Sequence, residues 1–149
     1  MRSFEPILFF SKKEKEQIIV AIREAEKKTS GEIRVHLAGR SREDILAHAG
    51  EIFEKIGMTK TTTRNGVLIF LEVKSRRFAV IGDAGIHERI PQGFWDEVAR
   101  GMGLHFRKNH FADGIVEAVR LTGEELSRYF PRERDDFNEL PDEISYSYS

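Results

Sequence analysis

The sequence predicts an α/β protein, a three-layer α/β/α sandwich whose mixed sheet contains a βαβ unit and a β-hairpin, with helices on both faces. Residues 67–73 are apolar at every position except Glu72, which is typical of a strand buried on both faces. The short polar turn at 74–77 leads into a second apolar run at 78–81, so these two strands are antiparallel. Residues 32–38 alternate apolar and polar, and a helical pattern separates them from the buried run. The first two strands are therefore expected to be parallel.

The length and composition indicate one globular domain with little affinity for nucleic acid. The chain has 149 residues, of which 33% are charged and 40% are hydrophobic, and its net charge is −1. Its basic residues are spread along the sequence, so a positively charged surface that binds nucleic-acid phosphates is not expected. There are no cysteines, which excludes disulfides, thiolate metal sites and cysteine nucleophiles.

The organisation along the chain predicts a single domain over residues 1–130 and a flexible acidic tail over 131–149. No apolar run is long enough to cross a bilayer, so no membrane insertion is expected. The apolar run at 7–10 is too short for the core of a signal peptide, and a cytoplasmic location is expected.

Helical periodicity predicts the remaining elements. Ser11 and Glu14 have the spacing of a capping box at the start of the first helix, which ends before residues 29–31. The second face of the 32–38 strand is expected to meet water, or at least to be polar, and this strand is expected to lie nearer a sheet edge than 67–73. Further helices are predicted over residues 42–56, 84–90, 94–108 and 114–129, with a threonine-rich loop at 58–64 and a linker at 109–113.

The topology brings three polar positions to one edge of the sheet. Glu32 opens the first strand, Asn65 and Gly66 open the parallel second strand, and Asp83 follows the antiparallel third strand. With a two-residue turn, Gly66 faces Asp83, and a four-residue turn would shift the pairing by two positions. Carboxylate and amide oxygens suit calcium or magnesium. The alternative is that Asp83 caps the next helix and that Asn65-Gly66 is only a turn.

Four short segments at these positions resemble the TPM domain family, which includes thylakoid-lumen proteins linked to photosystem II repair. The segments occur in the same order and spacing as in that family, and they are Ser30-Gly31-Glu32-Ile33, Asn65-Gly66-Val67-Leu68, Gly82-Asp83-Ala84-Gly85-Ile86 and Phe111-Ala112-Asp113-Gly114-Ile115. The ending Asn138-Glu139-Leu140-Pro141-Asp142-Glu143 is similar to a branch of small bacterial members.

The resemblance implies an α/β/α sandwich that binds a divalent cation, calcium foremost and magnesium second, at loops on one sheet edge. The metal-binding candidates that it implies are Glu32, Asn65, Asp83 and Asp96. It also implies the acid phosphatase activity proposed for the plant branch. Many members are exported and carry a membrane anchor, and neither feature is visible here.

Known phosphatase motifs are missing from the sequence, so no catalytic residue is assigned. There is neither an Asp-x-Asp nucleophile motif nor a cysteine, and a phosphatase would need metal-activated water. Arg64, Arg34 and His36 are candidates for phosphate binding, although Arg34 and His36 are interpreted as surface residues. The five-residue spacing of His105 and His110 disfavours a helical zinc pair.

Two functions are therefore expected, and the remaining alternative is a structural domain with no bound ion. The first is a divalent-cation-binding accessory or protein-interaction module, with the metal ion and a protein as its partners. The second is a metal-dependent phosphomonoesterase.

Overall fold

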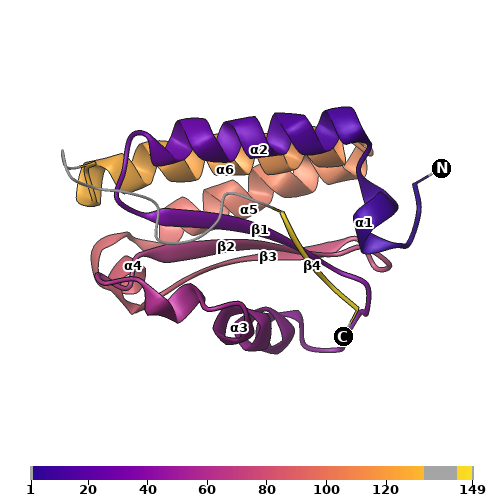
Figure 1. Ribbon diagram of the computed structural model, residues 1–149, viewed down its shortest axis with the longest axis horizontal. Helices are drawn as coiled ribbons and strands as arrows, with labels where there is room; N and C mark the ends of the chain where they lie inside the picture. Colours follow the sequence, from indigo (N-terminus) through magenta and orange to yellow (C-terminus); the bar gives the residue numbers. More distant parts are fainter. Residues whose placement is uncertain (1, 133–143, 149) are drawn as a thin grey trace.

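A four-stranded mixed sheet lies between two helical layers in the computed structural model, which describes residues 2–132 and 144–148 (Figure 1). The strand order is β3-β2-β1-β4. Strand β1 runs parallel to β2, β2 runs antiparallel to β3, and β4 runs parallel to β1. This arrangement confirms the predicted sandwich, the βαβ unit and the hairpin. The strands are β1 (Glu32–Ala38), β2 (Gly66–Glu72), β3 (Arg77–Gly82) and β4 (Ser145–Ser147).

The register of the three long strands is the one expected for the tighter turn. Glu32 lies opposite Gly66, and Val67 lies opposite Gly82. The pairing continues one residue further, because the N–H of Asp83 donates to the carbonyl of Gly66 at 3.0 Å. Arg76 closes the hairpin turn with a left-handed φ of 61°.

Three long helices cover one face of the sheet and a shorter helix covers the other. Figure 1 shows α2, α5 and α6 above the sheet and α3 below it. The helices are α1 (Pro6–Phe9), α2 (Lys12–Glu26), α3 (Ile45–Lys55), α4 (Ala84–Arg89), α5 (Gln92–Arg107) and α6 (Phe111–Tyr129), with a 3₁₀ turn η1 at Met58–Lys60.

Alternation along β1 and β2 divides the core into two layers. Ile33, Val35 and Val67 belong to the larger layer, which contains buried residues of α2, α5 and α6. Leu68 and Phe70 belong to the smaller layer with buried residues of α3. Successive side chains of a strand point to opposite faces, so one buried strand supplies both layers.

The predicted capping box begins α2. Ser11 Oγ accepts a hydrogen bond from the Glu14 N–H at 3.1 Å, and the Glu14 carboxylate accepts one from the Ser11 N–H at 3.0 Å. Glu14 also pairs with Arg2 at 2.6 Å. The hydrogen bond from Arg2 lowers the pKa of Glu14 to about 2, although partial burial opposes the shift.

The prediction that the polar face of the first strand meets water is wrong. Glu32, Arg34 and His36 are 2%, 7% and 1% exposed. Strand β4 covers His36, whose ring nitrogens lie 2.6 Å and 2.8 Å from the hydroxyls of Ser145 and Ser147. Alternation identifies the residues that share a face, but it does not reveal whether another element covers that face.

Three helices begin at residues other than the predicted ones, each for a local reason. Helix α3 begins at Ile45 because the side chain of Asp44 caps it, accepting from the Ala47 N–H at 3.1 Å. Helix α5 begins at Gln92, directly after Pro91. The linker predicted at 109–113 ends early, because Phe111 is buried in the core and opens α6.

Part of the predicted flexible tail is a strand of the domain. Residues 145–147 pair with β1, Ile144 is buried and Tyr146 packs against the larger core layer. Alternating serines and tyrosines can form a strand, but the acidic sequence before them favours a tail. Residues 133–143, which include the acidic ending noted above, lie outside the described residues.

Within residues 2–132 and 144–148, no helix combines the length and the apolar character needed to cross a membrane.

Candidate cation site at the sheet edge

The backbone brings Glu32, Asn65 and Asp83 to the same edge of the sheet, as the topology predicted. The Glu32 N–H donates to the Asn65 carbonyl at 3.3 Å, and the Asp83 N–H donates to the Gly66 carbonyl at 3.0 Å. By the alternation of the strands, both carboxylates project toward the α3 layer. Gly66 stands between them without a side chain. Two strand spacings separate their Cα atoms by roughly 10 Å.

All three side chains are withdrawn from solvent. Asn65 is 1% exposed, Glu32 is 2% exposed and Asp83 is 7% exposed. The Asn65 amide nitrogen lies 3.5 Å from Ser30 Oγ, whereas Asn65 Oδ1 is buried and has no hydrogen-bond partner in the described part of the chain. An unsatisfied buried acceptor costs about 1–3 kcal/mol. A cation ligated by that oxygen would remove the penalty, so Asn65 fits an oxygen-liganded ion.

Arg64 forms an ion pair with the carboxylate of Asp83. Arg64 Nε and Nη2 donate to its two oxygens at 2.6 Å and 2.7 Å, while the arginine side chain remains 48% exposed. Asp83 Oδ1 also accepts the Ala84 N–H at 2.7 Å and so caps α4. The helix-cap interpretation of Asp83 is therefore confirmed, and a cation would compete with Arg64 for the same oxygens.

Asp96 lies on a different element from the other three candidates. It is an exposed residue in the second turn of α5, and its carboxylate accepts a hydrogen bond from Gln92 at 3.2 Å. No hydrogen bond or ion pair between described residues connects it to the strand edge. Across residues 2–132 and 144–148, no group of three or more histidine, aspartate or glutamate side chains could hold a metal. The edge thus offers two carboxylates and one amide.

Comparison with known proteins decides the family. The family model of the TPM domain matches residues 7–125, which is most of the chain. The chain belongs to the TPM domain family. The search of curated proteins gives no match.

Two solved structures share the fold. The BA42 protein from the psychrophilic bacterium Bizionia argentinensis, solved by NMR, is 40% identical, with a TM-score of 0.87 over 93% of this chain and 95% of that chain. The N-terminal domain of a P. gingivalis protein is 20% identical, with a TM-score of 0.68 over 84% of this chain and 82% of that chain. The second likeness concerns the fold alone.

Glycines at this edge of the TPM domain allow the chain segments to approach closely. A Cβ on Gly66 would lie 3.1 Å from the Met58 carbonyl oxygen. A Cβ on Gly85 would lie 2.4 Å from the Thr63 carbonyl oxygen. The N–H of Gly85 donates to the Arg64 carbonyl at 2.9 Å. The start of α4 is therefore packed directly on the loop that carries Arg64 and Asn65.

A second buried polar cluster at the opposite end of β2 was not predicted as a site. Glu72 is fully buried, with its carboxylate 2.7 Å from His48 Nδ1, 2.9 Å from Arg77 Nη2 and 3.1 Å from Ser75 Oγ. Burial raises the pKa of Glu72, but its hydrogen bonds, that of His48 foremost, lower it overall. The sequence signal was Glu72 itself, the one charged residue in the buried run. Its oxygens already have partners, which indicates a structural role.

Arg34 and His36 do not face solvent, so their interpretation as surface residues is wrong. Both lie on the buried polar face of β1, and the His36 ring stacks on Phe70 with centroids 5.8 Å apart. Burial, followed by the nearby Arg34 and His48, lowers the pKa of His36 from 6.5 to about 4. Arg64 is the one of the three phosphate-binding candidates that reaches solvent.

Proposed function

We propose that this TPM domain binds a divalent cation, calcium or magnesium, at the edge formed by Glu32, Asn65 and Asp83, and that it acts as an accessory or interaction module. The observation that carries the proposal is Asn65 Oδ1, a buried acceptor without a hydrogen-bond partner among the described residues. The two residues that pair with the adjacent Gly66, Glu32 and Asp83, carry buried carboxylates. Hard oxygen donors of this kind favour calcium and magnesium over softer metals.

In this proposal the chain's own residues have separate roles. Glu32 and Asp83 supply negative charge, and Asn65 supplies a neutral oxygen. Arg64 balances the charge of Asp83 until the cation replaces it. The bound ion would neutralise both carboxylates and fix the Arg64–Asn65 loop against the start of α4. An ordered edge of this kind suits a module that presents a surface to a partner.

A phosphomonoesterase is the second candidate, and the exposure of Arg64 favours it. The Arg64 side chain is 48% exposed, and its guanidinium is paired with Asp83, one of the candidate cation ligands. Once released from Asp83, it could donate two hydrogen bonds to a phosphate group. The cation would supply an activated water and shield the phosphate charge.

A calcium titration followed by backbone amide NMR tests the cation proposal, with magnesium as the second ion. The expected result is saturable shifts confined to residues near 30–33, 64–67 and 82–86. Asp83→Asn and Asn65→Ala should each weaken binding. Asp96→Asn is the matched control, because it removes an exposed carboxylate from α5, and it should leave the affinity unchanged. Shifts spread over the surface, or equal losses in the control, would contradict the proposal.

A phosphate-ester assay in the presence of the bound ion separates the two functions. Turnover that Asp83→Asn abolishes would favour the phosphomonoesterase. Cation binding without turnover would favour the module.

A further inference from the structure

Strand β3 has one free edge in the described sheet. It pairs with β2 on one side, and no described strand pairs with it on the other. The N–H of Asp83 points toward β2. Backbone groups of every second residue in a strand point to the same side, so the N–H and C=O groups of residues 77, 79 and 81 also point toward β2. The corresponding groups of Phe78 and Val80 point outward. An outward row of backbone donors and acceptors is a template for an additional strand.

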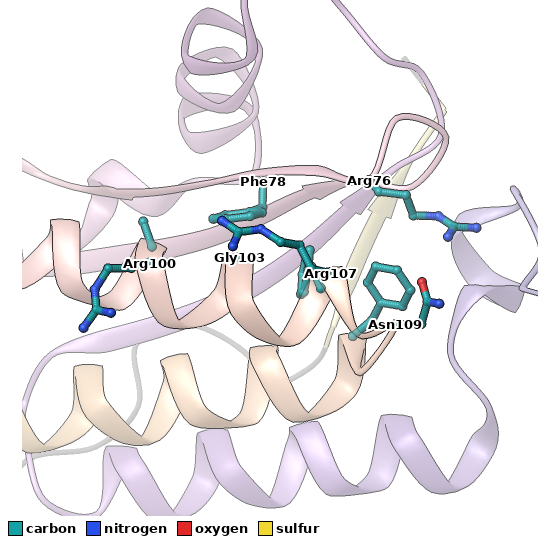
Figure 2. Close-up of a pocket in the computed structure, with 9 residues that line it drawn as sticks. Arg76, Phe78, Arg100, Gly103, Arg107 and Asn109 are labelled. Carbon is teal, nitrogen blue, oxygen red and sulfur yellow. The ribbon is translucent and has the colours of Figure 1, made fainter.

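A hollow of about 480 Å³ lies between this strand and helix α5 (Figure 2). Its apolar wall is formed by Phe78, Phe106 and Phe111. Phe78 and Phe106 meet edge to face with their ring centroids 5.0 Å apart. The aromatic rings give the groove the apolar surface that a docked side chain requires.

Three arginines line the hollow. Arg100, Arg107 and Arg76 are all labelled in Figure 2, with Arg76 at the hairpin turn and the other two on α5. Arg100 pairs with Glu97 at 2.7 Å, at the surface. Neither Arg76 nor Arg107 has an ion pair with a carboxylate within residues 2–132 and 144–148. The groove therefore has positive charge that this part of the chain does not neutralise.

The spacing of the arginine positions along α5 suits an elongated ligand. Arg100 and Arg107 are seven residues apart on α5, which corresponds to roughly 10 Å along the helix. That distance is about three residues of an extended strand. A series of acidic side chains on an extended segment can contact these positions one after another.

Gly103 keeps the groove open between the two helix arginines. A Cβ at this position would have Arg107 Nη2 and Phe78 Cζ as its nearest atoms, both at 3.9 Å. A larger side chain would therefore enter the groove without displacing the backbone. A Cβ on Gly93 of the same helix would meet no other described part of the chain within 4 Å, so Gly93 provides a matched control site.

We propose that the groove between β3 and α5 binds an extended acidic segment of a partner protein, which adds to the free edge of β3 as a further strand. Backbone hydrogen bonds to Phe78 and Val80 fix the segment, and its acidic side chains pair with Arg76, Arg100 and Arg107. The groove lies at the hairpin end of β3, whereas the candidate cation site lies at the Asp83 end. The proposal goes beyond the cation function and does not depend on it.

The test uses a fluorescein-labelled peptide of four Glu-Thr repeats, measured by fluorescence anisotropy and amide NMR at low salt with the full chain. Saturable binding is expected, with shifts confined to residues near 76–82 and 99–111. Gly103→Leu and Arg107→Glu should each weaken binding about tenfold or more. Gly93→Leu and Arg128→Glu, which change exposed positions outside the groove, should leave it within about twofold.

Two further peptides identify the mode of binding. The same sequence with every backbone nitrogen methylated keeps its charge but cannot donate strand hydrogen bonds, and it should not bind. A peptide of four Lys-Thr repeats should not bind either. Equal binding of the methylated peptide would show an ionic contact without strand addition and overturn the proposal. Absence of binding, or a dimer formed through the β3 edge in sedimentation, would overturn it as well.

Discussion

Arg64 and Asp83 form a two-point ion pair in which Nε and Nη2 of the arginine donate to the two carboxylate oxygens at 2.6 Å and 2.7 Å. Asp83 is 7% exposed, whereas the Arg64 side chain is 48% exposed. The buried partner is therefore held in place, and the exposed partner can swing into solvent. Because of this difference in exposure, Arg64 is the residue that would leave the Asp83 carboxylate when a cation binds.

Arg64→Gln should raise the calcium affinity by about threefold to tenfold, because the substitution removes the competing charge. Isothermal titration calorimetry at pH 7 measures the change directly. Arg100→Gln, which removes an exposed arginine from α5, is the control for net charge and should change the affinity little. A weaker affinity in Arg64→Gln would show that the guanidinium supports the site.

His36 should make the free energy of unfolding depend on pH between 6.5 and 4. Its pKa is about 4 in the folded chain against an ordinary 6.5, so only the unfolded chain takes up a proton in this range. Stability therefore falls as the pH falls, by about 3 kcal/mol over the full interval. Urea unfolding at several pH values measures this fall. In His36→Asn, the free energy of unfolding should decrease less between pH 6.5 and 4. An unchanged pH dependence would show that His36 is not its cause.

Glu72→Ala should destabilise the fold by about 3–5 kcal/mol, because it leaves the buried His48 and the cationic Arg77 without their shared carboxylate. Glu97→Ala removes a carboxylate whose pair with Arg100 is exposed, and it should cost less than about 1 kcal/mol. Chemical denaturation at pH 7 compares the two variants. Equal costs would mean that the buried cluster contributes no more than a surface pair.

The stabilisation by Glu72 should also disappear in acid. Its pKa is lowered in the folded chain, so its contribution is complete above the ordinary pKa of a glutamate and is lost as the pH falls through the folded value. The difference in stability between the original chain and Glu72→Gln should therefore shrink below about pH 4. A difference that stays constant down to pH 2 would contradict the lowered pKa.

Two glycine-to-alanine substitutions should change stability in opposite directions. Gly85→Ala places a Cβ 2.4 Å from the Thr63 carbonyl oxygen, and it should destabilise the fold by about 1–3 kcal/mol. Gly93→Ala adds a Cβ in open space on α5 and should stabilise the helix by up to about 1 kcal/mol. Thermal unfolding distinguishes them, since the melting temperature should fall in the first and rise in the second.

Local chemistry made much of the fold predictable. The unbroken apolar run of β2 is typical of a central strand, and the Ser11–Glu14 spacing marked the start of α2 because a capping box uses only those two residues. The edge shared by Glu32, Asn65 and Asp83 followed from strand direction alone. The hairpin register then brought Gly66 opposite Asp83, as the tighter turn requires.

Long-range relationships were not predictable in the same way. Strand β4 joins β1 across more than a hundred residues, and nothing near Ser145 identifies its neighbour. The pairing of Arg64 with Asp83 was also missed. Arg64 has a left-handed φ of 54°, which residues other than glycine rarely adopt and which nothing in the sequence predicts. For the same reason, the sequence could not distinguish a free carboxylate at this edge from one already paired.

The contact between His36 and Ser145 also affects how the chain folds. It joins residues 109 positions apart, whereas β2 and β3 meet across a short hairpin. Closing such a long loop carries a large entropy cost, and only three residues of β4 offset it. We expect β4 to dock after the other strands have paired, and to leave first when the native state opens locally. The amide hydrogens of residues 145–147 should then exchange with solvent well before those of β2.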